Sequence, residues 1–118
     1  MANLNYVYKV DLEKTGFGYT LKLIGGKYKM LILYTLSLNK RSMRFNALMR
    51  TIGNISHKTL ANSLQELAEV GLICRTEFVE VPVRVEYSLT DKGQTLLPVM
   101  DSICRWGENE LKISKKTC

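Results

Sequence analysis

The feature that most constrains this chain is the segment 44–69, RFNALMRTIGNISHKTLANSLQELAE, in which two short helical patterns flank a turn-like stretch at 51–55. The second pattern opens at Ser56, whose hydroxyl is suited to capping a helix. Its leucines at positions 60, 64 and 67 fall on one helix face, and its polar residues at 62, 63 and 66 fall on the other. This layout is typical of a helix-turn-helix, whose second helix presents a polar face outward.

Acidic residues are absent from the part of the chain that holds this motif. All 11 Asp and Glu residues lie at or before Glu13 or at or after Glu66, so residues 14–65 contain nine Lys or Arg and no acid. Positive charge around a candidate reader helix is expected where phosphates are approached and their counterions released. The alternative is a basic surface that is merely solvated.

Size and composition predict one globular domain. The chain has 118 residues, of which 46% are hydrophobic and 24% charged, which is ordinary for a packed core. No apolar run approaches the roughly 20 residues that a membrane span needs. The first residues, MANLNYVYKVDLEK, include acids and lack the apolar stretch of a secretory signal, so we expect a cytoplasmic protein.

Motifs for metal binding and catalysis are missing from the sequence. Cys74, Cys104 and Cys118 are widely spaced without a CxxC pair, which argues against a disulfide framework and a zinc site. The sequence also lacks HExxH, GxGxxG, P-loop and GxSxG motifs, and it has one histidine. We therefore expect no enzyme, no metal and no cofactor.

The segments before the helix-turn-helix should supply an arm and two helices. The pattern of residues 1–16 leaves open whether this arm is a strand, a helix or a loose segment. A first helix is expected over 19–24, and Gly25-Gly26 separates it from a second helix that runs from 27 to about 37. Apolar side chains surround the second helix, which should be the most deeply buried element. We expect the domain to span 17–113, with 114–118 as a tail.

After Gly71 the hydrophobic period changes to two, which indicates a hairpin. The strands are expected at 72–78 and 83–89, and Pro82 lies in the tip between them, where no backbone donor is needed. On the second strand, residues 83, 85, 87 and 89 should form the apolar face, and residues 84, 86 and 88 the polar face. A helix-turn-helix followed by such a hairpin predicts a mainly α winged-helix domain with a small β-hairpin wing.

The last helix, at about 90–113, carries more apolar surface than one domain requires. Thr90 can cap it before Asp91, and Pro98 should kink it or delay its regular start. We interpret part of its apolar stripe as a subunit interface, with packing onto the same domain as the alternative. The expected interface residues are Leu97, Met100, Ile103, Cys104, Trp106 and Leu111.

Four motifs together resemble those of the bacterial HxlR-type winged-helix regulators, which belong to the broader MarR-like group. The resemblance covers about residues 19–106 and implies a homodimeric, cytoplasmic transcription factor that binds operator DNA. It further implies a dimer formed by the N- and C-terminal helices, a recognition helix at 56–70 in the major groove, and a wing at 79–84 on flanking DNA. The motifs are IGGKYKMLIL (24–33), RFNAL (44–48), ISHKTLANSLQELAEVGLICR (55–75) and VPVRVEYSLTDKGQTLLPV (81–99).

Side-chain chemistry assigns roles within this recognition helix. Ser56 and the first-turn amides suit a phosphate, and Lys58 and Arg44 add positive charge. Asn62 is the best candidate for a bidentate contact with adenine, with a solvated helix surface as an equal alternative. The expected DNA-binding residues are Arg44, Asn46, Ser56, His57, Lys58, Thr59, Asn62, Ser63, Arg75 and Arg84.

The two hairpin arginines have two alternative roles. Arg84 and Arg75 could reach into a narrow minor groove. Each could instead pair with an acid across the hairpin, Glu86 for the first and Glu77 for the second. We favour a DNA contact for Arg84 and leave Arg75 undecided.

Regulation is less constrained by the sequence. Many HxlR-type relatives carry a cysteine just before the first core helix, and in some it is a redox or electrophile sensor. This chain has Thr15-Gly16-Phe17 there, and its three cysteines elsewhere are weak candidates for a redox switch. An unknown small-molecule effector could enter a space lined by aromatic and apolar side chains, although we favour a core role for them. Those residues are Tyr19, Tyr28, Tyr34, Met100 and Trp106.

Repression by blocking polymerase is the simplest expectation, with activation as an alternative. Two other functions compete with an operator-specific regulator. One is a winged-helix module that docks a protein partner, and the other is an architectural protein that binds DNA without sequence preference.

Overall fold

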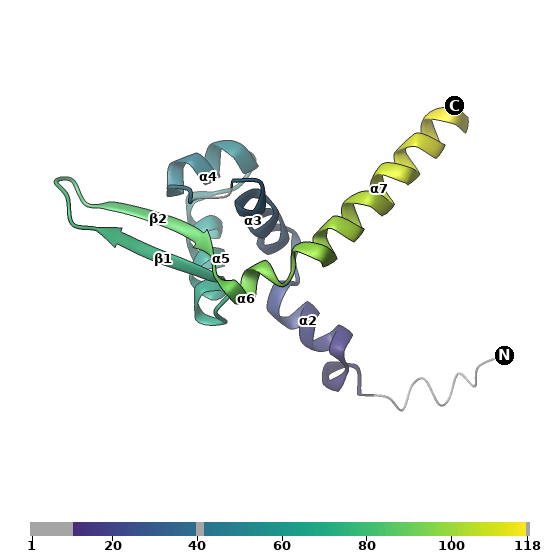
Figure 1. Cartoon of the computed structure of the whole chain (residues 1–118), viewed down its shortest axis with the longest axis horizontal. Coiled ribbons are helices and arrows are strands. Elements are labelled where there is room, and N and C mark those ends of the chain that lie inside the picture. The colour runs from purple at the N-terminus through teal and green to yellow at the C-terminus, as the bar shows by residue number, and fades with distance from the viewer. Residues whose placement is uncertain (1–10, 40–41, 118) are drawn as a thin grey trace.

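The computed structural model describes residues 11–39 and 42–117, and it has the expected mainly α architecture with one antiparallel hairpin (Figure 1). The hairpin projects from one side of the helical body, and the terminal helix projects from the other. The elements are η1 (Leu12–Lys14), α2 (Gly16–Ile24), α3 (Lys27–Leu38), α4 (Phe45–Ile52), α5 (His57–Glu69), β1 (Ile73–Phe78), β2 (Arg84–Leu89), α6 (Asp91–Gln94) and α7 (Leu97–Thr117).

The first helix begins earlier than its apolar pattern suggests. The Thr15 hydroxyl accepts a hydrogen bond of 3.0 Å from the Gly18 amide, so α2 begins at Gly16 rather than at Tyr19. A prediction based on the spacing of apolar residues does not detect this cap. The 3-10 turn η1 occupies part of the expected arm, and the prediction for residues 1–10 lies outside the described residues.

The core forms around α3, as predicted. This helix contributes Ile32, Leu33 and Leu36, each at most 2% exposed, and it contacts α4, α5 and β2. The leucines of α5 pack against it, because they form the apolar face of an amphipathic helix. The helix-turn-helix is therefore held by its inner faces, and its outer faces remain accessible.

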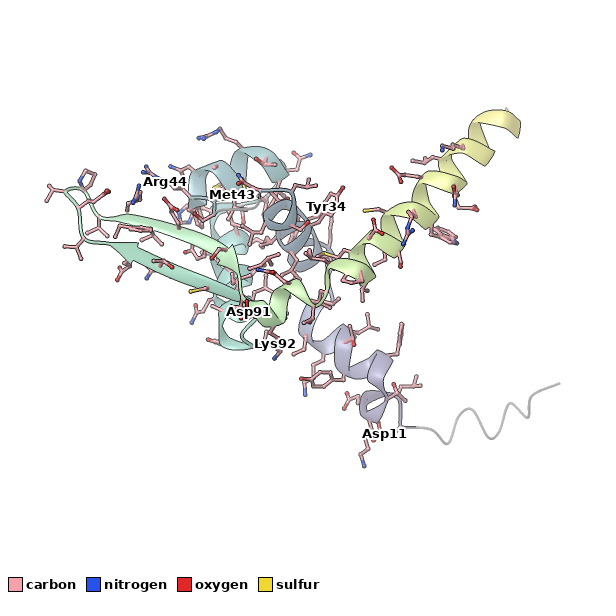
Figure 2. The ribbon with its side chains drawn as sticks, in the orientation of Figure 1. Asp11, Tyr34, Met43, Arg44, Asp91 and Lys92 are labelled. Carbon is pink, nitrogen blue, oxygen red and sulfur yellow. The ribbon has the colours of Figure 1, made fainter. Side chains whose placement is uncertain are left out.

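The hairpin is joined to the helical body along β2. Ile73 pairs with Leu89 and Phe78 with Arg84, which sets the register of the two strands. On the other edge of β2, Met43 and Tyr87 exchange two backbone hydrogen bonds of 2.9 and 2.8 Å (Figure 2 labels Met43). Tyr87 and Leu89 pack against the core, in agreement with the predicted apolar face of this strand. All of β2 is half-buried, because Ser42, in the segment before α4, also covers Glu86 on the predicted polar face.

The C-terminal helix is divided in two. Thr90 caps α6 by accepting from the Gly93 amide at 3.0 Å and donates to the Gly71 carbonyl at 2.6 Å. A regular helix resumes only at Leu97, directly before Pro98, as expected for a proline that delays the helix start. The helix α7 then runs to Thr117, past the predicted domain end at 113, so most of the expected tail is helical.

The close approach of α6 to the end of α5 generates a stability prediction. A Cβ at Gly93 would lie 2.1 Å from the Leu72 carbonyl oxygen, which is backbone and cannot move away cheaply. We expect Gly93→Ala to lower the free energy of unfolding by about 1–3 kcal/mol through overpacking. Gly16→Ala is the control, because nothing lies within 4 Å of its Cβ. Urea denaturation with equal midpoints for the two variants would contradict this.

Candidate nucleic-acid interface

The helix α5 presents a polar outer face at the surface of the helix-turn-helix. It starts after Ser56, whose hydroxyl accepts a hydrogen bond of 3.1 Å from the Thr59 amide. The turn before it needs the left-handed backbone at Gly53 and Asn54, with φ of 67° and 42°. His57, Lys58 and Asn62 are exposed, and Thr59 and Ser63 are half-buried.

An aromatic contact connects the two helices of the motif at their N-terminal ends. The rings of Phe45, the first residue of α4, and His57, the first residue of α5, have centroids 4.5 Å apart. Such tilted pairs contribute about 0.5–1.5 kcal/mol beyond area burial. The contact restrains the imidazole at the edge of the exposed face of α5.

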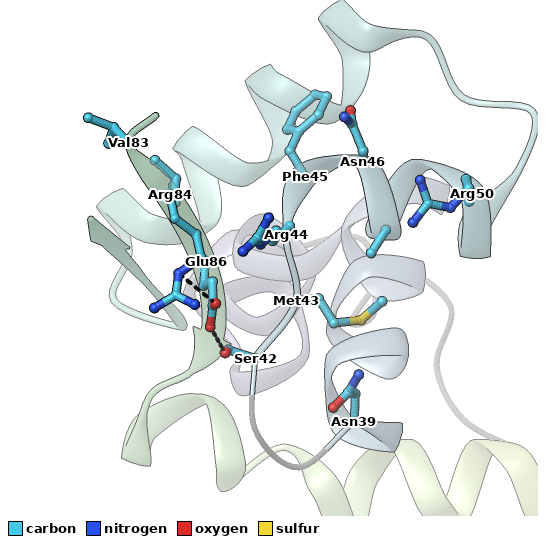
Figure 3. Close-up of a pocket in the computed structure, with 12 residues that line it drawn as sticks. Asn39, Ser42, Met43, Arg44, Phe45, Asn46, Arg50, Val83, Arg84 and Glu86 are labelled. Carbon is cyan, nitrogen blue, oxygen red and sulfur yellow. Dashed lines mark hydrogen bonds and ion pairs between the residues drawn. The ribbon is translucent and has the colours of Figure 1, made fainter. Parts of the chain in front are cut away.

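A cleft of about 630 Å³ lies between the start of α4 and the start of β2, next to the tip of the hairpin (Figure 3). It brings Arg44 and Asn46 together with Arg84, although these residues are some 40 positions apart in the sequence. Arg50 also lines the cleft, and the sequence analysis missed it. Its spacing of four from Asn46, inside the acid-free stretch, is the signal that could have found it.

Several basic side chains of the motif have no acidic partner. In the described part of the chain, Arg44, Arg50 and Lys58 form no ion pair within 4.0 Å, whereas Lys29 pairs with Glu66 at 2.7 Å. All three of these unpaired residues are exposed. Positive charge on the surface of the helix-turn-helix is therefore available to an external anion such as DNA phosphate.

The hairpin arginines are arranged differently, since both lie next to acids. The Arg84 Nε is 3.5 Å from Glu80 and 3.4 Å from Glu86. The Arg75 guanidinium is 3.5 Å from Glu77. The pairing that the sequence left open is thus present for both arginines, and these two arginines lie beside three acids of the hairpin.

The expected interface residues of α7 divide by burial. Leu97, Ile103, Trp106 and Leu111 are exposed, with 70% of Trp106 accessible, and Cys104 is half-buried. Met100 is only 5% exposed and belongs to the core of the single chain. The α2 residues Phe17, Tyr19 and Leu21 are also exposed, and the sequence analysis named none of them as a surface residue.

An apolar groove of about 610 Å³ lies between α2, α3 and α7, where the sequence suggested a space for an effector. Tyr34 and Met100 line it, and a hydrogen bond to Cys104 raises the pKa of Tyr34 (Figure 2 labels Tyr34). The expectation that the aromatics are core residues is wrong for Tyr19, Tyr34 and Trp106, which are exposed. They face solvent because α2 and α7 project away from the helical body (Figure 1).

The described residues offer few other reactive or metal-binding groups. Cys74 is exposed and Cys104 half-buried, both as free thiols, and Cys118 lies outside the described residues. Residues 11–39 and 42–117 contain no group of three metal-ligating side chains. None of the helices described is long and apolar enough to cross a membrane.

Comparison with known proteins decides the family. A family model described as HxlR-like helix-turn-helix matches residues 23–115, most of the chain. The chain belongs to the HxlR family. It is a transcriptional regulator with a helix-turn-helix DNA-binding domain, as its sequence and fold predicted.

Individual relatives agree with the family assignment. An HTH-type transcriptional regulator of Halalkalibacterium halodurans is 50% identical over 108 residues, which cover 91% of this chain and 95% of that protein. The crystal structure of the HTH-type regulator YtcD matches with a TM-score of 0.78 and 36% identity, covering 83% of this chain and 98% of that one. The redox regulator HypR in its oxidized form matches with a TM-score of 0.75 and 36% identity, covering 80% and 96%.

The cap of α5 generates a prediction for this HxlR-family protein. Ser56→Ala removes the acceptor for the Thr59 amide, so the free energy of unfolding should fall by about 1 kcal/mol. Ser56→Asp supplies another capping oxygen and should keep the stability near that of the wild type. Urea denaturation checks both variants. Equal destabilisation by alanine and aspartate would show that the hydroxyl does not act as a cap.

Proposed function

We propose that this HxlR-family regulator binds a specific operator as a homodimer and represses transcription by blocking polymerase. In this proposal each α5 enters a major groove, each wing lies on flanking DNA, and the protein acts in the bacterial cytoplasm on the nucleoid. The single observation that carries it is the exposed polar face of α5 beside Arg44, Arg50 and Lys58, which form no ion pair with any described acid.

The side chains of α5 suit the reading of base edges. Asn62 is exposed near the middle of the helix, and its amide can donate to and accept from adenine. His57, next to the Phe45 ring, lies one turn earlier with Lys58. The free amides of the first turn, after Ser56, can face a phosphate.

Phosphate contacts come from the cleft at the start of α4. Arg44 and Arg50 line it without an acidic partner among the described residues, and the first helix of such a motif crosses the DNA backbone. Arg84 also lines the cleft, from the start of β2 beside the tip of the wing. In this proposal the wing lies next to the phosphates that flank the groove occupied by α5.

Two copies would join through the apolar surfaces of α2 and α7. These surfaces are too extensive for single solvated positions, and they continue into the groove lined by Leu21 and Ile103. We assign this groove to the second copy, so an effector that entered it would change the angle between the two α5 helices. A dimer also explains specificity, because its two α5 helices would contact two half-sites one helical turn apart and the base contacts of both would contribute.

The first functional test is fluorescence anisotropy with DNA flanking the protein's own gene and with a scrambled duplex, at two salt concentrations. We expect tight binding to the native DNA only. Asn62→Ala should reduce the difference in binding free energy between the native and the scrambled duplex by about 1–3 kcal/mol. Arg50→Ala removes one phosphate contact from each copy of the dimer, so it should weaken binding to both duplexes and reduce the salt slope by about 1.8. Lys112→Ala, on α7, is the control and should change neither.

The other outcomes separate the competing functions. Equal and strongly salt-dependent binding to both duplexes would indicate an architectural protein. Absence of binding to either duplex would contradict the proposal and favour a winged-helix module with a protein partner.

The dimer is tested by sedimentation velocity. Ile103→Glu places a charge on the exposed apolar stripe of α7 and should convert dimers to monomers. Asn109→Glu adds the same side chain on a different side of α7 and should leave the dimer intact. Unchanged sedimentation of the Ile103 variant would remove α7 from the interface.

A further inference from the structure

We propose that Glu86 is a positioning residue, which fixes the wing against the helix-turn-helix and sets the direction of the Arg84 guanidinium toward flanking DNA. The part that concerns DNA rests on the function proposed above. The fixed geometry of the wing would then determine which base pairs beside the major-groove site are preferred.

Glu86 joins two elements that approach DNA together. One carboxylate oxygen accepts a hydrogen bond from the Ser42 hydroxyl, in the segment just before α4 (Figure 3). The other lies 3.4 Å from the Nε of Arg84 on the same strand. The Glu86 side chain is only 19% exposed, so water competes weakly for these contacts.

The backbone at the same place makes this connection short and direct. Met43, next to Ser42, exchanges two hydrogen bonds with Tyr87, next to Glu86. The segment then enters α4 at Phe45 with one residue between. A change at Glu86 is therefore transmitted to the angle between β2 and α4 with almost no intervening chain.

The Arg84 guanidinium is held on several sides. Its central carbon lies 4.1 Å from the centroid of the Phe78 ring, and a Glu80 carboxylate oxygen lies 3.5 Å from its Nε. The Nε is buried, so the 29% of the side chain that remains exposed belongs to other atoms. The terminal nitrogens are thus the donors that this geometry leaves for DNA.

Charge alone does not explain an acid at this position. A carboxylate beside a DNA site repels phosphates and would weaken binding if it served no other purpose. Glu77 provides the internal comparison, because it also pairs with an arginine of the hairpin but is 58% exposed. No described contact joins Glu77 to α4, and so it can share the charge effect of Glu86 without its positioning role.

The first part of the test needs no DNA. Amide hydrogen exchange is measured for the full-length protein and its Ser42→Ala, Glu86→Gln and Glu77→Gln variants. Loss of the link should accelerate exchange at the Met43 and Tyr87 amides in the first two variants. Glu77→Gln makes the same change of charge on the same hairpin and should leave both amides protected.

The second part measures affinity for the operator and for duplexes with single base-pair changes under the wing or under α5. For Ser42→Ala and Glu86→Gln, the ratio between the affinity for the operator and that for a duplex changed under the wing should fall about tenfold. A change of about tenfold is the usual effect of one base-pair mismatch. Discrimination under α5 should persist, which a general loss of structure would not allow. Glu77→Gln should retain both preferences.

The inference is overturned if the Ser42 and Glu86 variants behave like Glu77→Gln, or if only one of the two measurements changes. A wild-type protein that binds no operator would refute the proposed function and the DNA part of this inference together. The exchange rates would still decide whether Glu86 holds the wing.

Discussion

The structure depends on burial of one face of α5 against α3. Leu60, Leu64 and Leu67 are at most 1% exposed, and burying each such side chain contributes about 1.5–3 kcal/mol. Rotating α5 to hide Asn62 would expose these leucines, so the packing energy fixes which side of the helix faces outward. The packing of the core therefore determines that the polar face of α5 points outward, because a helix with one apolar face can be buried in only one orientation.

The wing is held by a different kind of contact. The core reaches β1 at Ile73, whereas the far end of the hairpin has few apolar partners. Directional contacts hold β2 against the segment before α4, through the backbone pair of Met43 with Tyr87 and the side chains around Glu86. Hydrogen bonds and ion pairs specify orientation more than they add stability, so they set the angle of the wing to α4, which we propose to matter for DNA binding.

Most of the secondary structure could be predicted because it follows local rules. Leucine spacing, the Ser56 cap and the change of period after Gly71 identified the helix-turn-helix and hairpin that the structure contains. The start of α2 at Gly16 was missed, since a cap without apolar spacing gives a weak pattern. The half-burial of β2 was missed because its cover comes from a segment some 40 residues earlier.

By itself, the sequence determined the winged-helix class, the polar face of α5 and the acid-free basic stretch, because periodicity and charge are properties of neighbouring residues. Only the tertiary structure decided which charges remain available. It brought Arg50 to the cleft with Arg44, placed Arg84 between Glu80 and Glu86, and left Trp106 exposed on α7. These outcomes depend on distances between segments remote in sequence, and such distances arise only when the core packs.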